Sequence, residues 1–325
     1  MSKAIRIHET GGPEVLRIEE VAVGEPATGQ ARVRHTAVGV NYIDTYHRSG
    51  MYKLALPSGL GAEAAGVVVA VGPGVAHVRP GDRVAYAASG APGAYAEERL
   101  VAADRLVKVP DGISDVTAAA VLLKGMTVWM LVRRVHRVEP GEQVLFHAAA
   151  GGVGVLALQW LKALGARVIA TVGSEEKAAL ARSLGAEHVV VYTREDFAKR
   201  TREWTGGAGV PVVYDSVGKE TFERSLDSLR PMGLMVSYGN ASGAVPPFEI
   251  AQLAAKGSLF LTRPTLFSYV ARREDLEAAA GALFEMIGTG KVKVQPPRTY
   301  PLAEAARAHR DLQSRATTGS LVLLP

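Results

Sequence analysis

The second half of the chain alternates short apolar runs with apolar helical patterns. Val144–Phe146 has the character of a buried parallel strand, and Val155–Lys162 repeats apolar residues at helical spacing. Gly165 follows this pattern in the place of the glycine that ends a helix. A second apolar run, Val168–Val172, comes next. The pattern predicts a strand–helix–strand unit, and the same alternation continues to Leu266.

The first part of the chain shows the period of β-strands. Ala31–Val38 alternates apolar and polar residues, Glu63–Val71 is apolar, and Gly81–Tyr86 follows a turn. Glycine and proline turns separate these runs, with little helical pattern before Asp115. A β-rich domain of antiparallel or barrel type is therefore predicted here.

A chain of 325 residues is long for a single hydrophobic core, so two domains are expected. The pattern predicts an α/β dinucleotide-binding domain over residues 120–267, with a doubly wound parallel sheet. An amphipathic helix over Arg273–Gly288 and a strand over Leu321–Leu324 follow it. We therefore assign residues 1–119 together with residues 268–325 to the β-rich domain.

Composition narrows the class of protein. Hydrophobic residues make up 48% of the chain and charged residues 21%, as in ordinary soluble domains. The net charge of +5 comes from scattered Lys and Arg rather than a basic tract, which does not favour nucleic-acid binding. Cysteine is absent, which excludes disulfides and Cys zinc sites. No apolar run of bilayer length and no signal peptide are recognised, so we expect a cytoplasmic protein that does not enter membranes.

The loop between the first strand and helix of the unit, Ala148 to Gly154, carries the candidate cofactor chemistry. Backbone N–H groups can approach a pyrophosphate where side chains are absent, and Gly151 and Gly152 meet that need. Gly154 stands where close helix–strand contact follows. A packed turn with no ligand is the alternative. The candidate ligands in this loop are Ala150, Gly151, Gly152, Val153 and Gly154.

The end of the second strand indicates which dinucleotide binds. NAD sites usually carry an Asp or Glu there for the ribose 2′-OH, but this chain has Gly173 and Ser174 and no carboxylate until Glu175. Lys177 follows within one helical turn. A hydroxyl, a cation and free N–H groups suit a 2′-phosphate, so NADPH is predicted over NADH. Without these neighbours, Lys177 would be interpreted as an ordinary solvated lysine. Tyr192 either lies beside the ribose phosphate or caps the sheet edge.

Several of these residues fall at the spacing of a known signature. They are Gly141–Glu142, Leu145, Ala149–Gly152, Gly154, Gln159 and Lys162. Along its whole length the chain resembles the zeta-crystallin-like quinone oxidoreductases of the medium-chain dehydrogenase/reductase superfamily. The resemblance implies a GroES-like catalytic domain built from both chain ends, which supports the β-rich domain assigned above.

Polar residues at the carboxyl ends of later strands extend the expected cofactor site, because open α/β sheets bind ligands at that edge. The run Ser314–Gly319 matches a C-terminal feature of the family and offers a cation for a phosphate. The expected contacts beyond the loop and the 2′-phosphate corner are Thr127, Ser216, Asn240, Ser242, Arg263 and Arg315.

The resemblance also indicates the reacting end of the site. Zinc-dependent relatives carry a Cys where this chain has Asn41 and a His where it has Ala62, and an amide and a methyl group cannot replace those ligands. Hydride transfer to an electron-poor acceptor, helped by hydrogen-bond donors, is therefore preferred. Asn41, Tyr46 and Tyr52 are the candidate catalytic donors, with packed tyrosines in a polar loop as the alternative. Lys124 is either a charge near the nicotinamide or an exposed lysine.

The predicted function is zinc-independent, NADPH-dependent reduction of quinones, with a one-electron (semiquinone) or two-electron product left open. An enone or alkenal reductase is the alternative enzyme. A protein that keeps NADPH binding but serves as a crystallin or RNA binder is the alternative from another class. The apolar run Ser258–Thr262 near the sheet edge could pair across a two-fold axis, as in relatives, so a homodimer is expected.

Overall fold

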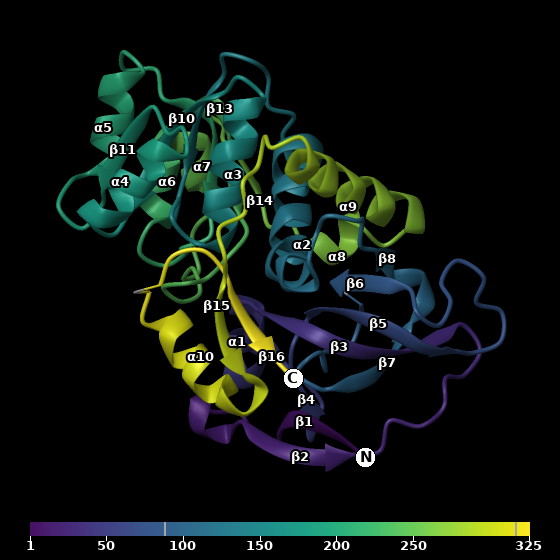
Figure 1. The fold of residues 1–325 in the computed structure, drawn as a ribbon. Coiled ribbons are helices and arrows are strands. Elements are labelled where there is room, and N and C mark those ends of the chain that lie inside the picture. Colours follow the sequence, from purple (N-terminus) through teal and green to yellow (C-terminus); the bar gives the residue numbers. More distant parts are fainter. Residues whose placement is uncertain (88, 316) are drawn as a thin grey trace. The chain divides into compact units, whose positions relative to one another are not determined.

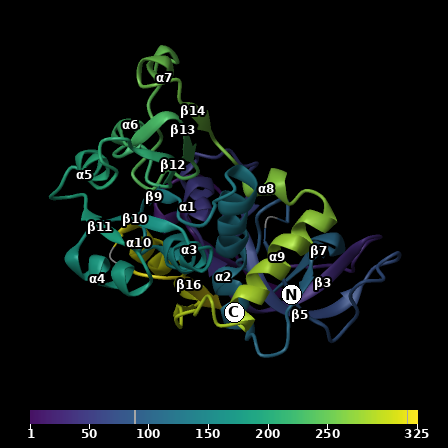
Figure 2. The same cartoon turned by 90° about the horizontal axis from the view of Figure 1, so that it is seen from above.

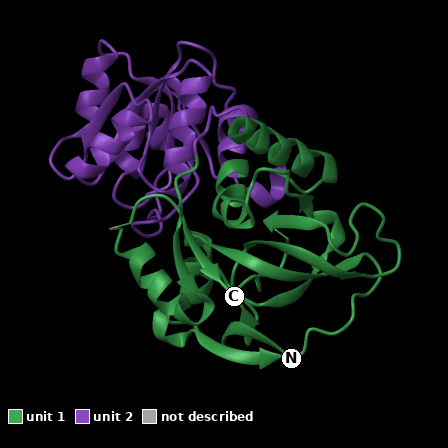
Figure 3. Ribbon diagram, viewed as in Figure 1, with its two compact units in different colours: residues 1–126, 270–288, 294–325 green, residues 127–269, 289–293 purple. Residues whose placement is uncertain are grey.

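A computed structural model describes residues 1–87, 89–315 and 317–325. The chain divides into two compact units (Figure 3). The first unit is Met1–Met126, Val270–Gly288 and Val294–Pro325, and the second is Thr127–Tyr269 with Thr289–Lys293. The units part at 126/127 and 269/270, whereas the sequence placed the boundaries at 119/120 and 267/268. The first of these divisions falls inside helix α2 (Asp115–Trp129).

The second unit is built on one parallel sheet. Its strand order is β11-β10-β9-β12-β13-β14. Figure 2 shows α3 and α4 on one face of the strands and α5 and α6 on the other. The strands are β9 (Gln143–Phe146), β10 (Arg167–Val172), β11 (His188–Val191), β12 (Val210–Asp215), β13 (Leu229–Ser237) and β14 (Phe260–Thr262). The helices are α3 (Gly152–Ala163), α4 (Glu175–Ser183), α5 (Phe197–Trp204), α6 (Phe222–Asp227), α7 (Ala251–Ala255) and α8 (Leu266–Tyr269). The predicted doubly wound fold is confirmed.

Strand β9 lies in the middle of this sheet, and its apolar side chains suit a position that is covered on both faces. Val144, Leu145 and Phe146 have no exposed surface, as expected of a strand covered by helices on both sides. The helix that follows, α3, ends where the sequence predicted: Gly165 has φ 77°, the left-handed conformation of a residue just past a helix end. These two elements fix the loop between them.

The first unit contains two sheets. The larger has the order β15-β16-β3-β5-β6-β8, with β7 also paired to β3, and the smaller has the order β2-β1-β4. Figure 1 shows the C-terminal strand β16 beside β3, and Leu321 pairs with Val40. The strands are β1 (Ser2–Ile7), β2 (Arg17–Val21), β3 (Gln30–Val40), β4 (Ser58–Gly59), β5 (Glu63–Val71), β6 (Arg83–Ala87), β7 (Glu98–Ala102), β8 (Val107–Lys108), β15 (Arg298–Pro301) and β16 (Leu321–Leu324). Both ends of the chain therefore build one β-rich unit.

The longer helices of this unit include one that the sequence pattern missed. They are α1 (Tyr42–Ser49), α2, α9 (Arg273–Gly288) and α10 (Ala305–Gln313). Helix α1 is short, so its apolar residues show too few turns to reveal a period. Its ends are nevertheless specified: Asp44 Oδ2 accepts the N–H of the N-cap residue Asn41 at 2.8 Å. Gly50, with φ 82°, ends it.

Helix α2 continues as a π-helical turn over Met130–Val135. The combined segment Asp115–Val135 is long and apolar enough to cross a membrane, so the sequence expectation that no such stretch exists is wrong on length and composition. In the structure, however, 72% of its most apolar window is buried. A buried core helix of a folded protein can be as long and as apolar as a membrane-spanning helix, and the burial of this segment fits that case. No other such helix occurs among the described residues.

Candidate cofactor and acceptor sites

The loop from β9 to α3 is shaped for a ligand that approaches the backbone. Gly151 is the N-cap of α3, and the first bond of the helix runs from Val155 N–H to Gly151 O at 3.0 Å. The N–H groups before Val155 therefore stand at a helix N-terminus, where no intrahelical acceptor is available. A Cβ at Gly154 would lie 2.5 Å from Ala148 O, so glycine is required at that position. This arrangement fits the pyrophosphate of a dinucleotide.

The predicted 2′-phosphate corner comes together at the ends of β10 and β11. Ser174 caps helix α4, and its Oγ accepts the Lys177 backbone N–H at 3.3 Å, which leaves the hydroxyl proton available to donate. A Cβ added to Gly173 would lie 3.6 Å from the Tyr192 hydroxyl, so these two residues are neighbours. The sequence missed Arg194, whose exposed guanidinium lies 3.4 Å from Glu175 at the same corner.

The ends of β13 and β14 bring Asn240 and Arg263 together. The surroundings of the Asn240 amide orient it so that Oδ1 accepts from Arg263 Nη2 at 3.0 Å. Arg263 Nη1 also donates to Gly239 O at 3.1 Å, so this side chain clamps the backbone after β13. Ser242 is used differently: its Oγ donates to Val217 O at 2.7 Å, within the protein itself.

Two further predicted cofactor contacts, Ser216 and Thr127, belong to the second unit. Ser216 follows β12 directly, and its carbonyl oxygen accepts the N–H of Ala241 at 3.1 Å, which ties the ends of β12 and β13 together. Thr127 lies within α2 and is the first residue of the second unit.

A buried polar network supports the same sheet edge. Asp215 Oδ2 accepts from the Thr221 hydroxyl at 2.7 Å and from the Ser225 hydroxyl at 2.9 Å. His147 joins the network, with Nε2 3.0 Å from Ser225 Oγ and Nδ1 2.7 Å from Thr171 Oγ1. Burial lowers the pKa of His147, with Asp215 opposing the shift. The network links the ends of β9, β10 and β12 and so holds the base of the glycine loop.

The candidate catalytic residues of the first unit lie within helix α1 or just beyond its two ends. Tyr46 lies in the helix and is 8% exposed. Tyr52 follows the helix, with its ring 5.3 Å from that of Tyr46 in an edge-on arrangement and its N–H donated to Tyr46 O at 3.0 Å. The Tyr42 hydroxyl donates to Leu312 O at 3.0 Å, which anchors α1 to the end of α10. Tyr46 and Tyr52 thus form one cluster, and Asn41 is the N-cap of the helix that carries Tyr46.

Asn41 is engaged with a residue that the sequence reasoning overlooked. Its Nδ2 donates to Glu63 Oε2 at 2.8 Å, and Leu123 N–H donates to Glu63 Oε1 at 2.6 Å. Glu63 has no exposed surface, and the Lys124 ammonium lies 3.5 Å from its Oε2. Lys124 itself is only 6% exposed, so the alternative of an exposed lysine is wrong. Proximity in sequence to Ala62 was the available signal for Glu63.

A second buried chain of hydrogen bonds begins at Asp44. Asp44 Oδ2 accepts from the Tyr95 hydroxyl at 3.0 Å, Tyr95 Oη lies 2.9 Å from His309 Nε2, and Arg48 Nη1 lies 3.0 Å from His309 Nδ1. Burial raises the pKa of Asp44 to about 7, against the opposing hydrogen bonds from Asn41 N–H and Tyr95. Burial lowers the pKa of His309 to about 3. Arg48 therefore donates to Nδ1, and the Nε2–H donates to Tyr95.

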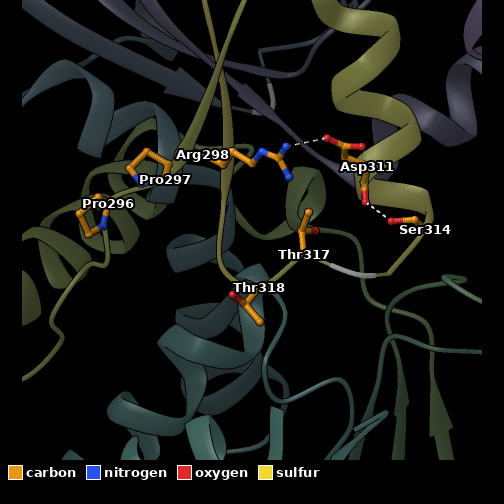
Figure 4. A pocket seen from close by; sticks show the side chains of 7 residues that line it. All are labelled: Pro296, Pro297, Arg298, Asp311, Ser314, Thr317 and Thr318. Atoms are coloured by element: carbon orange, nitrogen blue, oxygen red, sulfur yellow. Dashed lines mark hydrogen bonds and ion pairs between the residues drawn. The ribbon is translucent and has the colours of Figure 1, made fainter. Parts of the chain in front are cut away.

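Arg315 lies just past α10, with φ 56°, a left-handed conformation that is uncommon outside glycine. Its neighbour Ala316 lies outside the described residues. A cavity of about 410 Å³ opens beside this turn (Figure 4). Its lining residues are Pro296, Pro297, Arg298, Asp311, Ser314, Thr317 and Thr318. Arg298 and Asp311 form an ion pair across it at 3.4 Å.

The residues available do not fit a zinc site. Asn41 offers an amide already bonded to Glu63, and Ala62 offers a methyl group. Across residues 1–87, 89–315 and 317–325, no group of three His, Asp or Glu side chains is placed to hold a metal ion.

The fold and the loop define a class of protein. Residues 27–111 match the family model described as the alcohol dehydrogenase GroES-like domain, and residues 152–284 match the model described as zinc-binding dehydrogenase. A GroES-like β-rich unit with a doubly wound dinucleotide-binding unit inserted in it is the architecture of the medium-chain dehydrogenases/reductases.

Individual relatives narrow the class further. The chain is 51% identical to quinone oxidoreductase 1 of Escherichia coli K12 and 47% identical to 2-haloacrylate reductase of a Burkholderia species, covering all of this chain and at least 99% of each relative. The crystal structure of E. coli quinone oxidoreductase complexed with NADPH matches with a TM-score of 0.98 over 99% of this chain and 100% of that chain. The chain belongs to the quinone oxidoreductase family.

Proposed function

We propose that this protein is an NADPH-dependent quinone oxidoreductase. The observation that carries the proposal is the corner at the ends of β10 and β11, where Gly173 lies beside Tyr192 and where Gly173 and Ser174, rather than a carboxylate, directly follow β10. A hydroxyl and a nearby cation complement a 2′-phosphate. The similarity to an NADPH-bound quinone oxidoreductase supports the same cofactor.

The proposed cofactor site follows from the sheet edge. The N–H groups at the start of α3 hold the pyrophosphate, with Gly154 allowing the close approach. Lys177 pairs with the 2′-phosphate, and Arg315 adds charge to a phosphate. Thr127, Ser216, Asn240 and Arg263 shape the rest of the site. Ser242 holds the segment after β13 in place, because its hydroxyl and its backbone N–H both donate to Val217 O. The domain assignment, with residues 120–267 binding the cofactor, is part of this proposal.

The reaction is hydride transfer to a quinone. Reduced nicotinamide supplies the hydride, and the protein supplies position and hydrogen-bond donors. Tyr46 and Tyr52 lie close enough to act on one acceptor; Tyr46 is in α1, whose N-cap is Asn41, and Tyr52 follows the end of that helix. Quinones are electron-poor, so hydrogen bonds are sufficient help and a metal Lewis acid is not needed.

Steady-state oxidation of NADPH tests the proposal. The protein is mixed with NADPH and 1,4-benzoquinone, with an alkenal, or with no acceptor. We expect fast NADPH oxidation with the quinone, a slower rate with NADH, and no reaction without acceptor. Tight NADPH binding without turnover on any acceptor would instead support the crystallin-like or RNA-binding role.

Reduction of an activated alkene is the second candidate, favoured by the 47% identity to a 2-haloacrylate reductase. That reaction needs the same hydride and, in addition, a proton delivered to carbon. Product analysis separates the two candidates: 2-chloroacrylate supplied with NADPH yields the saturated acid only if the alkene is reduced. A turnover number with 2-chloroacrylate above that with benzoquinone would favour the alkene.

Assembly and location are further parts of the proposal. The edge strand β14 carries Phe260, which is 61% exposed, and an uncovered apolar strand edge favours pairing with a second copy. We propose a cytoplasmic homodimer. Light scattering after gel filtration should give twice the chain mass for the wild type and the chain mass for Phe260→Asp. A monomeric wild type would overturn the proposed dimer.

A further inference from the structure

Lys124 is a buried cation whose donors have no acceptor among the residues that the structure describes. Its residue is 6% exposed, and no acceptor among the described residues lies within hydrogen-bonding distance and geometry of its Nζ. Its charge partner is Glu63, at 3.5 Å, which is an ion pair beyond the usual length of a charged hydrogen bond. A lysine ammonium carries three donors, and leaving them unpaired in a buried place costs free energy. The burial of an ammonium group with unpaired donors therefore calls for a functional explanation.

Glu63 is the charge partner of the Lys124 ammonium but does not use up its donors. Each carboxylate oxygen already accepts an N–H, from Asn41 Nδ2 at 2.8 Å and from Leu123 N at 2.6 Å. These bonds hold the carboxylate in place beside the Lys124 ammonium. Two N–H groups thus donate hydrogen bonds to the Glu63 carboxylate, whereas the donors of the Lys124 ammonium are available to bind another oxygen.

We propose that the Lys124 ammonium binds the oxygen of the acceptor that becomes negatively charged during reduction, and that Glu63 is its positioning residue. The inference rests on the proposed function. It concerns a residue absent from the candidate catalytic set of Asn41, Tyr46 and Tyr52. The ligand chemistry is an oxygen anion conjugated to a ring or alkene: a phenolate from a quinone or an enolate from an enone.

The step balances without a further reagent. A hydride with its two electrons passes from reduced nicotinamide to the acceptor, whose conjugated carbonyl oxygen becomes an oxyanion. The Lys124 ammonium donates a hydrogen bond to that oxyanion, and a proton from water completes the phenol. Stabilising charge only as it develops is what lowers a barrier. A cation next to a phenolate lowers its pKa by about 1–3 units.

A phenol whose colour reports its ionisation tests the claim without turnover. 4-Nitrophenol absorbs visible light as the phenolate, so its titration can be followed while bound to the protein saturated with NADP⁺. In the wild type we expect the bound phenol to titrate at least about one unit below the free phenol. Lys124→Met should return it to the free value or above. Lys108→Met is the matched control, because Lys108 is ion-paired with Asp82 in the same unit but has a side chain 59% exposed.

Two further measurements keep the outcome decisive. If Lys124→Met fails to fold because Glu63 is left unpaired, Glu63→Gln/Lys124→Met removes both charges and restores the fold. Its bound phenol should then titrate as the free phenol does. The same depressed titration in a folded Lys124 variant, or no binding of nitrophenol to the wild type, overturns the proposal. A wild type that binds nitrophenol as expected but does not oxidise NADPH with benzoquinone overturns the proposed function instead.

Kinetics give a second readout. Lys124→Met should lower kcat with benzoquinone by about tenfold or more while the KM for NADPH stays within a factor of two, as for loss of an interaction made in the transition state. A purely structural lysine would change thermal stability and leave kcat per folded molecule intact, and that result would contradict the proposal.

Discussion

Asn41 donates its amide Nδ2 to Glu63 Oε2 at 2.8 Å, with both side chains buried. The bond fixes the direction of the amide, so Oδ1 points away from Glu63 because the group is planar. The Asn41 side chain also accepts the backbone N–H of Asp44 in the capping box of α1, so what it can present to a ligand is its second amide N–H. The donor role predicted for Asn41 from the sequence would therefore depend on that one remaining N–H.

Replacement of single donors in this cluster should have modest effects. If Tyr46 or Tyr52 donates to a quinone oxygen, Tyr→Phe should lower turnover by on the order of tenfold, the scale of one lost donor. If a ring only lines the pocket, Tyr→Phe is silent and Tyr→Ala raises the KM. Asn41→Ala should lower turnover by a similar factor and also loosen Glu63, whose carboxylate then loses one donor.

Steady-state kinetics of the three variants with one quinone check this expectation. Tyr42→Phe is a useful comparison, because its hydroxyl donates to Leu312 O rather than to a reacting group. A thousandfold fall in turnover for any one of Tyr46, Tyr52 or Asn41, with NADPH binding unchanged, would identify a dedicated catalytic acid and contradict a shared role.

The 2′-phosphate corner predicts cofactor preference. Lys177→Ala should weaken NADPH binding by about 1–2 kcal/mol, the scale of a charge-assisted hydrogen bond, and leave NADH binding nearly unchanged. Calorimetric titration with both cofactors measures this. Lys199→Ala is the charge-matched control, because Lys199 is an exposed lysine on α5. Equal losses for NADPH and NADH would show that Lys177 does not recognise the phosphate.

Metal removal should leave the activity intact. The chain has no cysteine, and Asn41 and Ala62 stand at two expected ligand positions, so zinc has no suitable donor set here. Exhaustive dialysis against a chelator should therefore preserve NADPH oxidation with benzoquinone, and elemental analysis should find no stoichiometric zinc. Loss of activity that added zinc restores would disprove a zinc-independent reaction.

Much of the fold could be predicted because its signals are local. The run Val144–Phe146, the loop to Gly154 and the glycine at 165 each carry their own physical reason, and the parallel unit appeared where they placed it. Helix α1 was missed because eight residues give little periodicity. Its caps, Asn41 with Asp44 at the start and Gly50 at the end, were the only local signals, and they are short.

The site was harder to predict because its important contacts join distant parts of the chain. Glu63 meets Asn41 and Leu123 through the pairing of β3 with β5 and the packing of α2, which no local pattern reveals. The burial of Lys124 is likewise a property of the folded unit. Sequence reasoning finds residue types and spacings, whereas the partner of a buried charge is set by tertiary structure.

The buried chain from Arg48 to Asp44 predicts how stability depends on pH. Burial lowers the pKa of His309 to about 3 in the folded protein, from its ordinary value of 6.5. Below pH 6.5 the unfolded chain binds a proton that the folded protein refuses, so His309 makes the free energy of unfolding fall as pH falls. Asp44 acts oppositely. Its pKa is raised to about 7 from 3.8, so the folded protein binds the extra proton between pH 7 and 4, and its contribution to stability grows as pH falls.

Variants without these titrations should separate the two contributions. His309→Gln keeps a donor and an acceptor but cannot titrate, so between pH 6 and 4.5 it should lose less stability on acidification than the wild type, by about 1.4 kcal/mol per pH unit for one proton. Asp44→Asn should lose more stability than the wild type over the same interval. Burial also lowers the pKa of His35 to about 4, but His35 is common to all the proteins and cancels in the differences. Urea denaturation at several pH values gives the slopes, with His8→Gln, a replacement of an exposed histidine, as the control. Identical slopes for the wild type and His309→Gln would show that His309 does not stay neutral in the folded protein.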